Sequence, residues 1–234
     1  MYTVRDSQAK TAVHTVLAAV LQVRQGRLEA LLWQRAREPQ AGAWALPGGV
    51  LEPEETLEDC VRRQLAQKVD VRELSHLEQL ETLSDPSRNP ERRELATAFL
   101  GLVPSDADPR VPDDTAWHRF ECLPPLAFDH ASILLAARER LRGKLSYTNL
   151  GFALAPPTFT MAELRGLYEA ALGHPVSATN LQRVLLRRGL LEATGEQRHH
   201  GGAGGRPAAI YRFQTRELEI TDQFAVLRPP TMAR

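Results

Sequence analysis

A glycine pair, several carboxylates and an amphipathic stretch follow one another in residues 47–71, PGGVLEPEETLEDCVRRQLAQKVDV. Pro47-Gly48-Gly49 permits a tight turn and a close approach of the backbone to a ligand. Apolar residues then recur at every fourth position, at Leu57, Val61, Leu65 and Val69. This spacing predicts a helix that starts near Leu57, with Thr56 as its N-cap. The segment is interpreted as a ligand-binding turn in front of a helix, or else as an ordinary amphipathic helix that happens to follow a Gly-Gly turn.

Three positions of the predicted helix decide whether it has the ligands for a metal ion. Positions 64, 67 and 68 are spaced i, i+3 and i+4, so they share one face. Gln64 and Gln67 offer neutral oxygens, and Lys68 offers only a positive charge and hydrogen-bond donors. Because magnesium prefers anionic oxygen ligands, we assign no catalytic residue and no metal ligand to this face.

The segment resembles the signature of the Nudix hydrolases. In that family a Gly is followed after five residues by Glu, then after seven more by Arg-Glu, an apolar residue, any residue, Glu-Glu, any residue and Gly. The matching positions here are Gly49, Glu55, Arg63, Leu65 and Val71. The magnesium-binding glutamates of the family are replaced, because the Arg-Glu pair is Arg63-Gln64 and the Glu-Glu pair is Gln67-Lys68. The closing Gly is Asp70. The resemblance implies a nucleotide-diphosphate pocket that has lost its metal-dependent chemistry, and we therefore expect at most very slow hydrolysis.

The charges are unevenly distributed along a chain of 234 residues whose formal net charge is zero. Residues 144–234 contain 11 Lys and Arg against 7 Asp and Glu, so the preceding residues carry the opposite excess. This length allows one large or two modest domains. The basic C-terminal part indicates an anionic partner for that part alone.

The composition also indicates the compartment. Cys60 and Cys122 form no CxxC spacing and predict no disulfide framework. The first residues lack a signal-peptide pattern, and no apolar run approaches the ~18 residues of a membrane span. We therefore expect a cytoplasmic protein that has no membrane partner.

Hydrophobic patterning predicts an α/β sandwich over residues 1–143. Strands are expected at residues 13–23, 28–34, 77–83 and 95–103, with a short further segment at 117–123. Helices are expected at residues 57–69 and at about 130–142. A domain boundary is expected near Gly143–Lys144, where the pattern changes.

Residues 144–234 are predicted to form a winged helix-turn-helix domain. Thr160 and Glu163 have capping-box spacing at the start of a helix that Gly173 ends. A second helix is expected between Ser177 and Gly189. Two strands, 190–194 and 208–213, then flank a Gly-rich basic loop. The second helix is expected in the DNA major groove and the hairpin at phosphates or the minor groove.

The second helix of this domain has a polar face opposite its apolar one. Asn180, Arg183 and Arg187 lie at i, i+3 and i+7, away from the apolar positions. Such a face is often simply solvated, but the basic hairpin that follows favours DNA binding. The candidate DNA-binding residues are Thr179, Asn180, Arg183, Arg187, Arg188, Arg198, His199 and Arg206.

Three further stretches are similar to one subgroup, the Nudix-related transcriptional regulators of NrtR type. They are LPPLAFDHASIL at 123–134, YTN at 147–149 and GRPAAIYRF at 205–213. This resemblance implies a homodimeric repressor of NAD biosynthesis and salvage genes, in which a Nudix-like domain is joined to a winged helix. It implies ADP-ribose or a related NAD metabolite as the effector that releases double-stranded operator DNA. No cofactor is expected beyond that effector.

The candidate ligand-binding residues surround the glycine pair or carry charges and rings suited to a nucleotide diphosphate. Arginine can pair a diphosphate bidentately, and an indole can stack on a base. These candidates are Arg35, Trp44, Gly48, Gly49, Glu55, Arg63, Arg92, Arg93 and His130. Glu55 and Arg63 are also suited to a mutual ion pair, and the loop that carries Arg88, Arg92 and Arg93 to simple solvation. Asp129 and His130 are suited equally to capping a helix.

Two other functions are kept as alternatives. The first is an active, magnesium-dependent ADP-ribose pyrophosphatase with an irregular metal site formed by Glu52, Glu54, Glu55 and Glu58. The second is a protein-interaction module in which the winged helix binds a partner protein.

Overall fold

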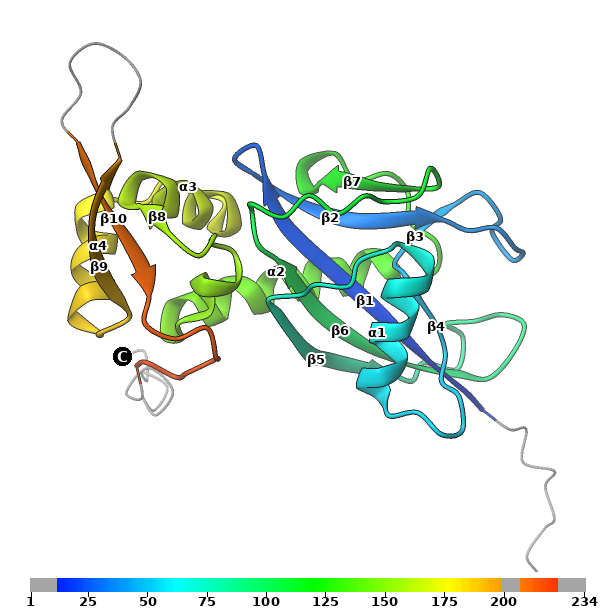
Figure 1. Ribbon diagram of the computed structural model, residues 1–234. Coiled ribbons are helices and arrows are strands. Elements are labelled where there is room, and N and C mark those ends of the chain that lie inside the picture. The colour runs from blue at the N-terminus through cyan, green and yellow to red at the C-terminus, as the bar shows by residue number, and fades with distance from the viewer. Residues whose placement is uncertain (1–11, 199–206, 223–234) are drawn as a thin grey trace, which may run out of the picture.

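The computed structural model describes residues 12–198 and 207–222, and its N-terminal part is built around one mixed sheet (Figure 1). The strands of this part are β1 (Val13–Arg24), β2 (Arg27–Gln34), β3 (Trp44–Ala45), β4 (Gly48–Val50), β5 (His76–Leu83), β6 (Glu94–Val103) and β7 (Thr115–Arg119). The helices are α1 (Leu57–Lys68), α2 (His130–Tyr147) and the short 3₁₀ helix η1 (Phe120–Cys122). The strand order is β3-β2-β1-β6-β5, with β4 paired to β1 and β7 paired to β2. Only β1 and β6 run parallel among the paired strands of this part.

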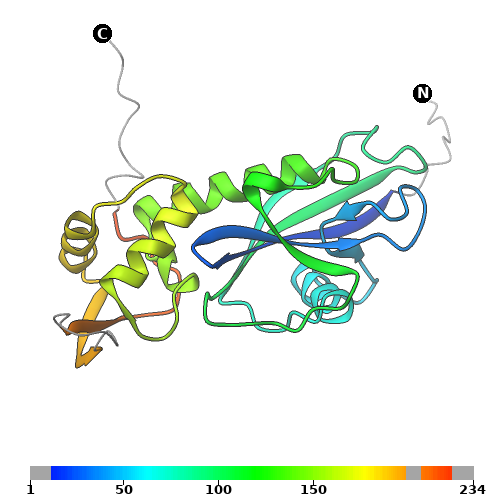
Figure 2. The same cartoon turned by 90° about the horizontal axis from the view of Figure 1, so that it is seen from above.

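Alternation along β1 divides the core between the two faces of the sheet. Val16, Ala18 and Val20 pack with α1, whereas Leu17, Ala19 and Leu21 pack on the α2 side. This follows from the two-residue period of a strand. Figure 2 shows α1 and α2 on opposite sides of the sheet, which therefore forms the middle layer of a sandwich.

Helix α1 begins and ends close to the positions predicted from its sequence. The Thr56 hydroxyl accepts from the Asp59 backbone N–H, and the Asp59 carboxylate accepts from the Thr56 backbone N–H, which completes a capping box. Val61, Leu65 and Val69 are buried. The predicted apolar stripe is thus confirmed.

Helix α2 is longer than predicted, because it continues to Tyr147 rather than ending near residue 142. The predicted boundary at Gly143–Lys144 therefore lies inside a helix and not in a linker. Leu141 and Leu145 are buried on either side of Gly143. Their burial outweighs the ~1 kcal/mol by which glycine disfavours a helix relative to alanine.

The C-terminal part contains two helices and a small sheet. Its elements are η2 (Leu150–Ala153), β8 (Phe159–Thr160), α3 (Met161–Leu172), α4 (Ala178–Arg187), β9 (Leu191–Arg198) and β10 (Ala208–Phe213). The sheet order is β8-β10-β9. Thr160 and Glu163 form the predicted capping box, and Gly173 ends α3 with a φ of 76°. The predicted fold class, an α/β sandwich followed by a winged helix, is confirmed.

One apolar core runs through both parts. It includes Leu141 of α2, Leu164 of α3 and Leu185 of α4. The Phe159 and Phe213 rings pack with their centroids 5.4 Å apart. Among the described helices none is long and apolar enough to cross a membrane.

The stretch 147–149 connects α2 to the segment that follows the wing. The Asn149 side-chain amide donates to the Glu217 carbonyl at 2.7 Å and accepts from the Glu219 backbone N–H at 2.8 Å. Thr148 pairs with Ile220 through an isolated antiparallel bridge. The end of α2 is therefore fixed to the winged helix by hydrogen bonds as well as by apolar packing.

Candidate effector pocket and nucleic-acid interface

A cavity of about 340 Å³ opens beside the glycine pair. Its walls come from β1, β2 and β4, the end of α1, the loops at residues 35–39 and 84–93, and the start of α2. This volume lies at the lower end of the range of small-molecule sites. Its charged lining residues are Arg35, Arg37, Glu38, Lys68, Arg88, Glu91, Arg92 and Glu94. Cations therefore outnumber carboxylates on its walls, which favours an anionic ligand.

The structure brings five of the nine predicted ligand-binding residues to this cavity. They are Arg35, Gly48, Gly49, Arg92 and His130. Trp44, Glu55, Arg63 and Arg93 are absent from its lining. Each of these four is engaged elsewhere, as described below.

Gly48 and Gly49 form a strand and not the predicted tight turn. They belong to β4, which pairs with β1 in the register Leu17–Gly48 and Val16–Gly49. A Cβ on Gly48 would lie 2.1 Å from the Val16 carbonyl oxygen, and a Cβ on Gly49 would lie 2.4 Å from the Gln64 side chain. Glycine is therefore required for close packing against β1 and α1, and that packing places the backbone at the cavity wall.

Arg35 is the arginine at the end of β2 that faces the cavity. Its Nε donates to the Pro39 carbonyl at 3.0 Å, and its guanidinium lies 4.7 Å from the Phe128 ring centroid. Partial burial lowers the pKa of Arg35, against the opposing effect of nearby glutamates. Since the Arg35 guanidinium donates to the carbonyls of Pro39 and Arg37 and not to a carboxylate, its charge is available to an anion in the cavity.

The indole that lines the cavity, beside the Phe128 ring, belongs to Trp33 and not to the predicted Trp44. Trp33 packs against the core on the α1 side of the sheet, whereas Trp44 packs against the core on the α2 side. The Trp44 ring lies edge-on against His118, with centroids 4.4 Å apart. Side chains two residues apart on a strand point to the same face of the sheet. Because Trp33 lies two residues before Arg35, this alternation could have predicted that Trp33 shares the face of Arg35.

Lys68 is a further pocket residue that the sequence reasoning did not assign to ligand binding. Its ammonium donates to the Gly48 carbonyl oxygen and lies 4.6 Å from the Trp33 ring centroid. Burial lowers its pKa, and the positive charges of Arg35, Arg63 and Arg37 lower it further. The signal that could have identified Lys68 is its place at a metal-binding position of the Nudix signature.

The loop at residues 84–93 contributes to the cavity through a buried ion-pair network. Arg88 binds Asp129 and Glu94, and Arg92 also binds Glu94. Burial alone would raise the pKa of Glu94, but hydrogen bonds from Asn89, Arg92 and Thr15 outweigh it and lower that pKa. Arg88 is therefore a structural residue, since each of its three guanidinium nitrogens donates to a carboxylate.

Arg93 points away from the cavity, contrary to its predicted role. Its Nη1 donates to the Ser84 carbonyl at 2.8 Å, and its own carbonyl accepts from the Val13 backbone N–H. These bonds close the base of the loop. The neighbouring Arg92 keeps a place in the cavity lining because it faces Glu94.

His130 lines the cavity and also begins α2. Its Nδ1 accepts a hydrogen bond from the Leu46 backbone N–H at 3.0 Å. Burial lowers the pKa of His130 to about 4, so the ring is neutral at pH 7. The preceding Asp129 is the N-cap residue, but its carboxylate binds Arg88 instead of a helix N–H.

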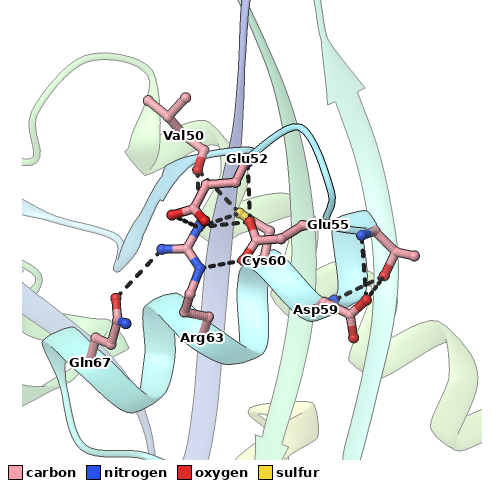
Figure 3. Close-up of polar contacts among 8 residues, drawn as sticks. Val50, Glu52, Glu55, Asp59, Cys60, Arg63 and Gln67 are labelled. Atoms are coloured by element: carbon pink, nitrogen blue, oxygen red, sulfur yellow. Dashed lines mark hydrogen bonds and ion pairs between the residues drawn. The ribbon is translucent and has the colours of Figure 1, made fainter.

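Glu55 and Arg63 form the mutual ion pair that the sequence suggested (Figure 3). Arg63 also binds Glu52 at 3.2 Å and donates to the Val50 carbonyl at 3.3 Å. The hydrogen bond from Arg63 holds the pKa of Glu55 at about 2. Both residues stabilise the junction of β4 and α1, which explains why neither lines the cavity.

The same contacts argue against an irregular magnesium site at this junction. Glu52 and Glu55 both pair with Arg63, and Glu58 pairs with Arg62 at 2.8 Å. In the described parts of the chain, no three His, Cys, Asp or Glu side chains form a group that could hold a metal ion. With Lys68 at the cavity wall, the donor set of α1 does not fit magnesium.

Helix α4 presents the predicted polar face to solvent. Thr179, Asn180, Arg183 and Arg187 are exposed, whereas Leu181 and Leu185 are buried. Gln182 donates to the Tyr211 hydroxyl at 3.0 Å and so fixes α4 against the β9–β10 hairpin. Figure 1 shows α4 and this hairpin at the end of the molecule farthest from β4 and the glycine pair. The arrangement is that of a recognition helix beside a wing.

Two predicted DNA-binding arginines are engaged within the protein. Arg188 donates to the Ser146 carbonyl and to the Asp222 carboxylate, both at 2.9 Å, and does not share the face of Arg183 and Arg187. Arg188 thus connects the end of α4 to the end of α2. Arg198 pairs with Glu163 at 2.5 Å and connects the wing to α3, although it stays partly exposed. His199 and Arg206 lie outside the described residues.

Each part of the chain matches a known protein family. Residues 13–137 match the NUDIX domain, and residues 151–213 match the NrtR DNA-binding winged helix domain. The chain is 34% identical over 223 residues to the ADPR responsive transcriptional repressor NtrR of Acinetobacter baylyi, covering 92% of this chain and 88% of that protein.

Solved structures resemble both the whole chain and its first part. Shewanella oneidensis NrtR complexed with a 27mer DNA is 33% identical with a TM-score of 0.73, covering 86% of this chain and 93% of that chain. The NUDIX domain of Shewanella oneidensis NrtR complexed with ADP ribose is 32% identical with a TM-score of 0.53. That match covers 59% of this chain and 94% of the other.

Proposed function

Because this chain belongs to the family of Nudix-related transcriptional regulators of NrtR type, we propose that it is an effector-controlled transcriptional repressor. It binds operator DNA through its winged helix and is released when ADP-ribose or a related NAD metabolite occupies the cavity. The observation that carries this proposal is the presence, on one continuous core, of a cationic cavity and an exposed recognition helix. Its targets are proposed to be genes of NAD biosynthesis and salvage, and its place of action the cytoplasm.

The cavity has the chemistry that a nucleotide diphosphate requires. Arg35 and Lys68 offer charged donors to the phosphate oxygens, and Trp33 and Phe128 offer ring faces. The complex of the related Shewanella domain with ADP-ribose supports the choice of this effector.

We propose that the effector is bound without being cleaved. The α1 positions that bear metal-binding glutamates in the Nudix hydrolases are Gln64, Gln67 and Lys68 here, and Glu55 is held by Arg63. Without a fitting metal site, the chain lacks the several kcal/mol of transition-state stabilisation that a metal supplies. No cofactor is therefore proposed for the regulator.

DNA binding is proposed to require a homodimer. A single short recognition helix reads only one half-site, and two such helices fit successive major grooves about 34 Å apart. Arg183 and Arg187 would bind phosphates or bases together with Asn180. The complex of Shewanella NrtR with DNA supports this use of the winged helix.

Helix α2 offers a physical connection from the cavity to the recognition helix. Its first residue, His130, lines the cavity, and the preceding Asp129 is fixed to the cavity loop by Arg88. Near its other end, the Ser146 carbonyl accepts from Arg188 at the end of α4. The helix has 18 residues and so spans ~27 Å. We propose that the effector shifts the population towards a dimer in which α2 holds the two recognition helices out of register with the operator.

Fluorescence anisotropy with a labelled promoter duplex from an NAD-pathway gene tests this function. The chain should bind the duplex, and ADP-ribose should release it, whereas Arg35→Ala should bind the duplex but respond far less to ADP-ribose. Failure to bind any duplex would favour the protein-interaction alternative. Magnesium-dependent turnover of ADP-ribose, abolished by Glu55→Gln, would favour the pyrophosphatase alternative.

A further inference from the structure

Lys68 occupies an unusual position for a lysine in the cavity. It stands where the Nudix signature has a glutamate that binds magnesium, and its ammonium lies at the cavity wall beside the backbone of Gly48. In those hydrolases this position recruits a divalent cation. Here the side chain itself carries the positive charge.

No carboxylate of the described residues forms an ion pair with Lys68. Within the described residues no carboxylate lies within 4.0 Å of its ammonium, whose contacts are the Gly48 carbonyl and the Trp33 ring. Burial and the positive charges of Arg35, Arg63 and Arg37 lower the pKa of Lys68. A partly desolvated cation in a positive field is unfavourable by itself and becomes favourable when an anion binds.

The ammonium also has unused donor capacity. An ammonium offers three N–H donors, and the Gly48 carbonyl accepts from one of them. No other acceptor among the described residues binds this ammonium, so its remaining donors can meet phosphate oxygens in the cavity that Gly48 and Gly49 line. A lysine ammonium acts in such a site as a compact point charge.

We propose that Lys68 takes the place of the divalent cation, so that the chain binds its diphosphate effector without any metal. This inference rests on the proposed effector site, and it names Lys68 as the positive charge that binds the diphosphate there. It also accounts for binding without cleavage, since an ammonium neutralises phosphate charge but does not lower the pKa of a water molecule as a metal ion does.

Isothermal titration of the full-length chain tests this proposal, with ADP-ribose and inorganic pyrophosphate as separate probes. Each titration is run in EDTA and in magnesium. The variants are Lys68→Met, which keeps the length without the charge, Lys68→Arg, which keeps the charge, and Lys68→Glu, which restores the carboxylate. Arg62→Met, on the exposed side of the same helix, is the matched control for loss of one positive charge. Circular dichroism establishes that each variant is folded.

The wild-type chain should bind both probes equally well in EDTA and in magnesium. Lys68→Met should weaken binding by about ten- to a hundredfold, the value of one charge-assisted hydrogen bond. Lys68→Arg should keep most of the affinity, and Lys68→Glu should bind measurably only with magnesium. Arg62→Met should bind like the wild-type chain.

The results separate this inference from the proposed function. Binding of ADP-ribose only in magnesium, or equal binding by Lys68→Met and the wild-type chain, would overturn the role of Lys68 and leave the effector assignment intact. Metal-independent binding of pyrophosphate but not of ADP-ribose would support Lys68 and overturn the effector. Binding of neither probe in EDTA would overturn the role of Lys68.

Discussion

The Arg88 guanidinium binds both oxygens of the Asp129 carboxylate, with nitrogen–oxygen distances of 2.9 and 3.1 Å. This bidentate pair joins the loop that walls the cavity to the N-cap residue of α2, 41 positions later in the chain. Arg88 also binds Glu94 at 2.9 Å, and only 3% of its side chain is exposed. The start of α2 is therefore held by the same network that shapes the effector cavity.

Replacing Arg88 with Met should destabilise the protein by about 3–5 kcal/mol, because two partly buried carboxylates would lose their partner. Urea unfolding followed by circular dichroism measures this change. Arg92→Met is the matched control, since Arg92 is 47% exposed and Glu94 retains other partners. The Arg92→Met variant should lose less than about 1 kcal/mol of unfolding free energy. Similar losses for the two variants would show that Arg88 is not a central residue of the network.

Gly48→Ala should be far more damaging than a glycine substitution in an open position. The new Cβ would meet the Val16 carbonyl oxygen, which belongs to the backbone of the central strand and has little freedom to move. We expect a loss of about 1–3 kcal/mol and weaker effector binding. Gly143→Ala is the control, because Gly143 lies inside helix α2 and an added Cβ would meet no atom within 4 Å. This substitution should stabilise the protein by up to ~1 kcal/mol, since alanine favours a helix over glycine. A Gly48→Ala protein with unchanged melting temperature would contradict the packing argument.

Buried His130 should make the stability depend on pH between 6.5 and 4. Its folded-state pKa of about 4 lies below its ordinary value of 6.5. In this window the unfolded chain binds a proton that the folded protein does not, so stability falls as the pH falls. The contribution is complete above pH 6.5, and its loss amounts to at most about 3 kcal/mol.

The His130→Asn variant isolates this effect, because its side-chain oxygen can accept from Leu46 N–H but does not titrate. Urea unfolding at pH 7 and pH 5 should show a smaller difference for the variant than for the wild-type chain. The comparison with wild type is needed since burial lowers the pKa of His118 as well. Glu78, whose pKa is held at about 2, loses its contribution only below its ordinary value of 4.5. Equal pH dependence in both proteins would rule out His130 as the source.

Arg183→Ala and Arg187→Ala should each weaken DNA binding and reduce the slope of log affinity against log salt by about one if the side chain binds a phosphate. A larger loss on the operator than on random duplex would indicate a base contact instead. Anisotropy titrations at several salt concentrations provide both quantities. Arg62→Ala, on α1, removes the same charge and should leave affinity and slope unchanged. Full operator binding by the Arg183→Ala, Arg187→Ala double variant would contradict α4 as the recognition helix.

The sequence was most informative where one element depends on its own neighbours. Thr56 and Thr160 cap their helices as predicted, and the Glu55–Arg63 pair forms between residues only eight positions apart. Its errors concern residues whose direction depends on distant elements. Trp44 and Arg188 face away from their predicted partners because the His118 ring and the Ser146 carbonyl, far along the chain, hold them instead.

The sequence by itself determined the two-part architecture and the polar face of α4, because periodicity and spacing express local geometry, whereas the loss of the metal-binding carboxylates was implied by the resemblance to the Nudix signature. Only the tertiary structure decided that Trp33 and Lys68 line the cavity and that Arg88 forms ion pairs with Asp129 and Glu94. It also decided that α2 runs unbroken from the cavity to the winged helix. The physical reason is that the partner of a charged or aromatic side chain is chosen by competition among groups that only the packed sheet and helices bring together.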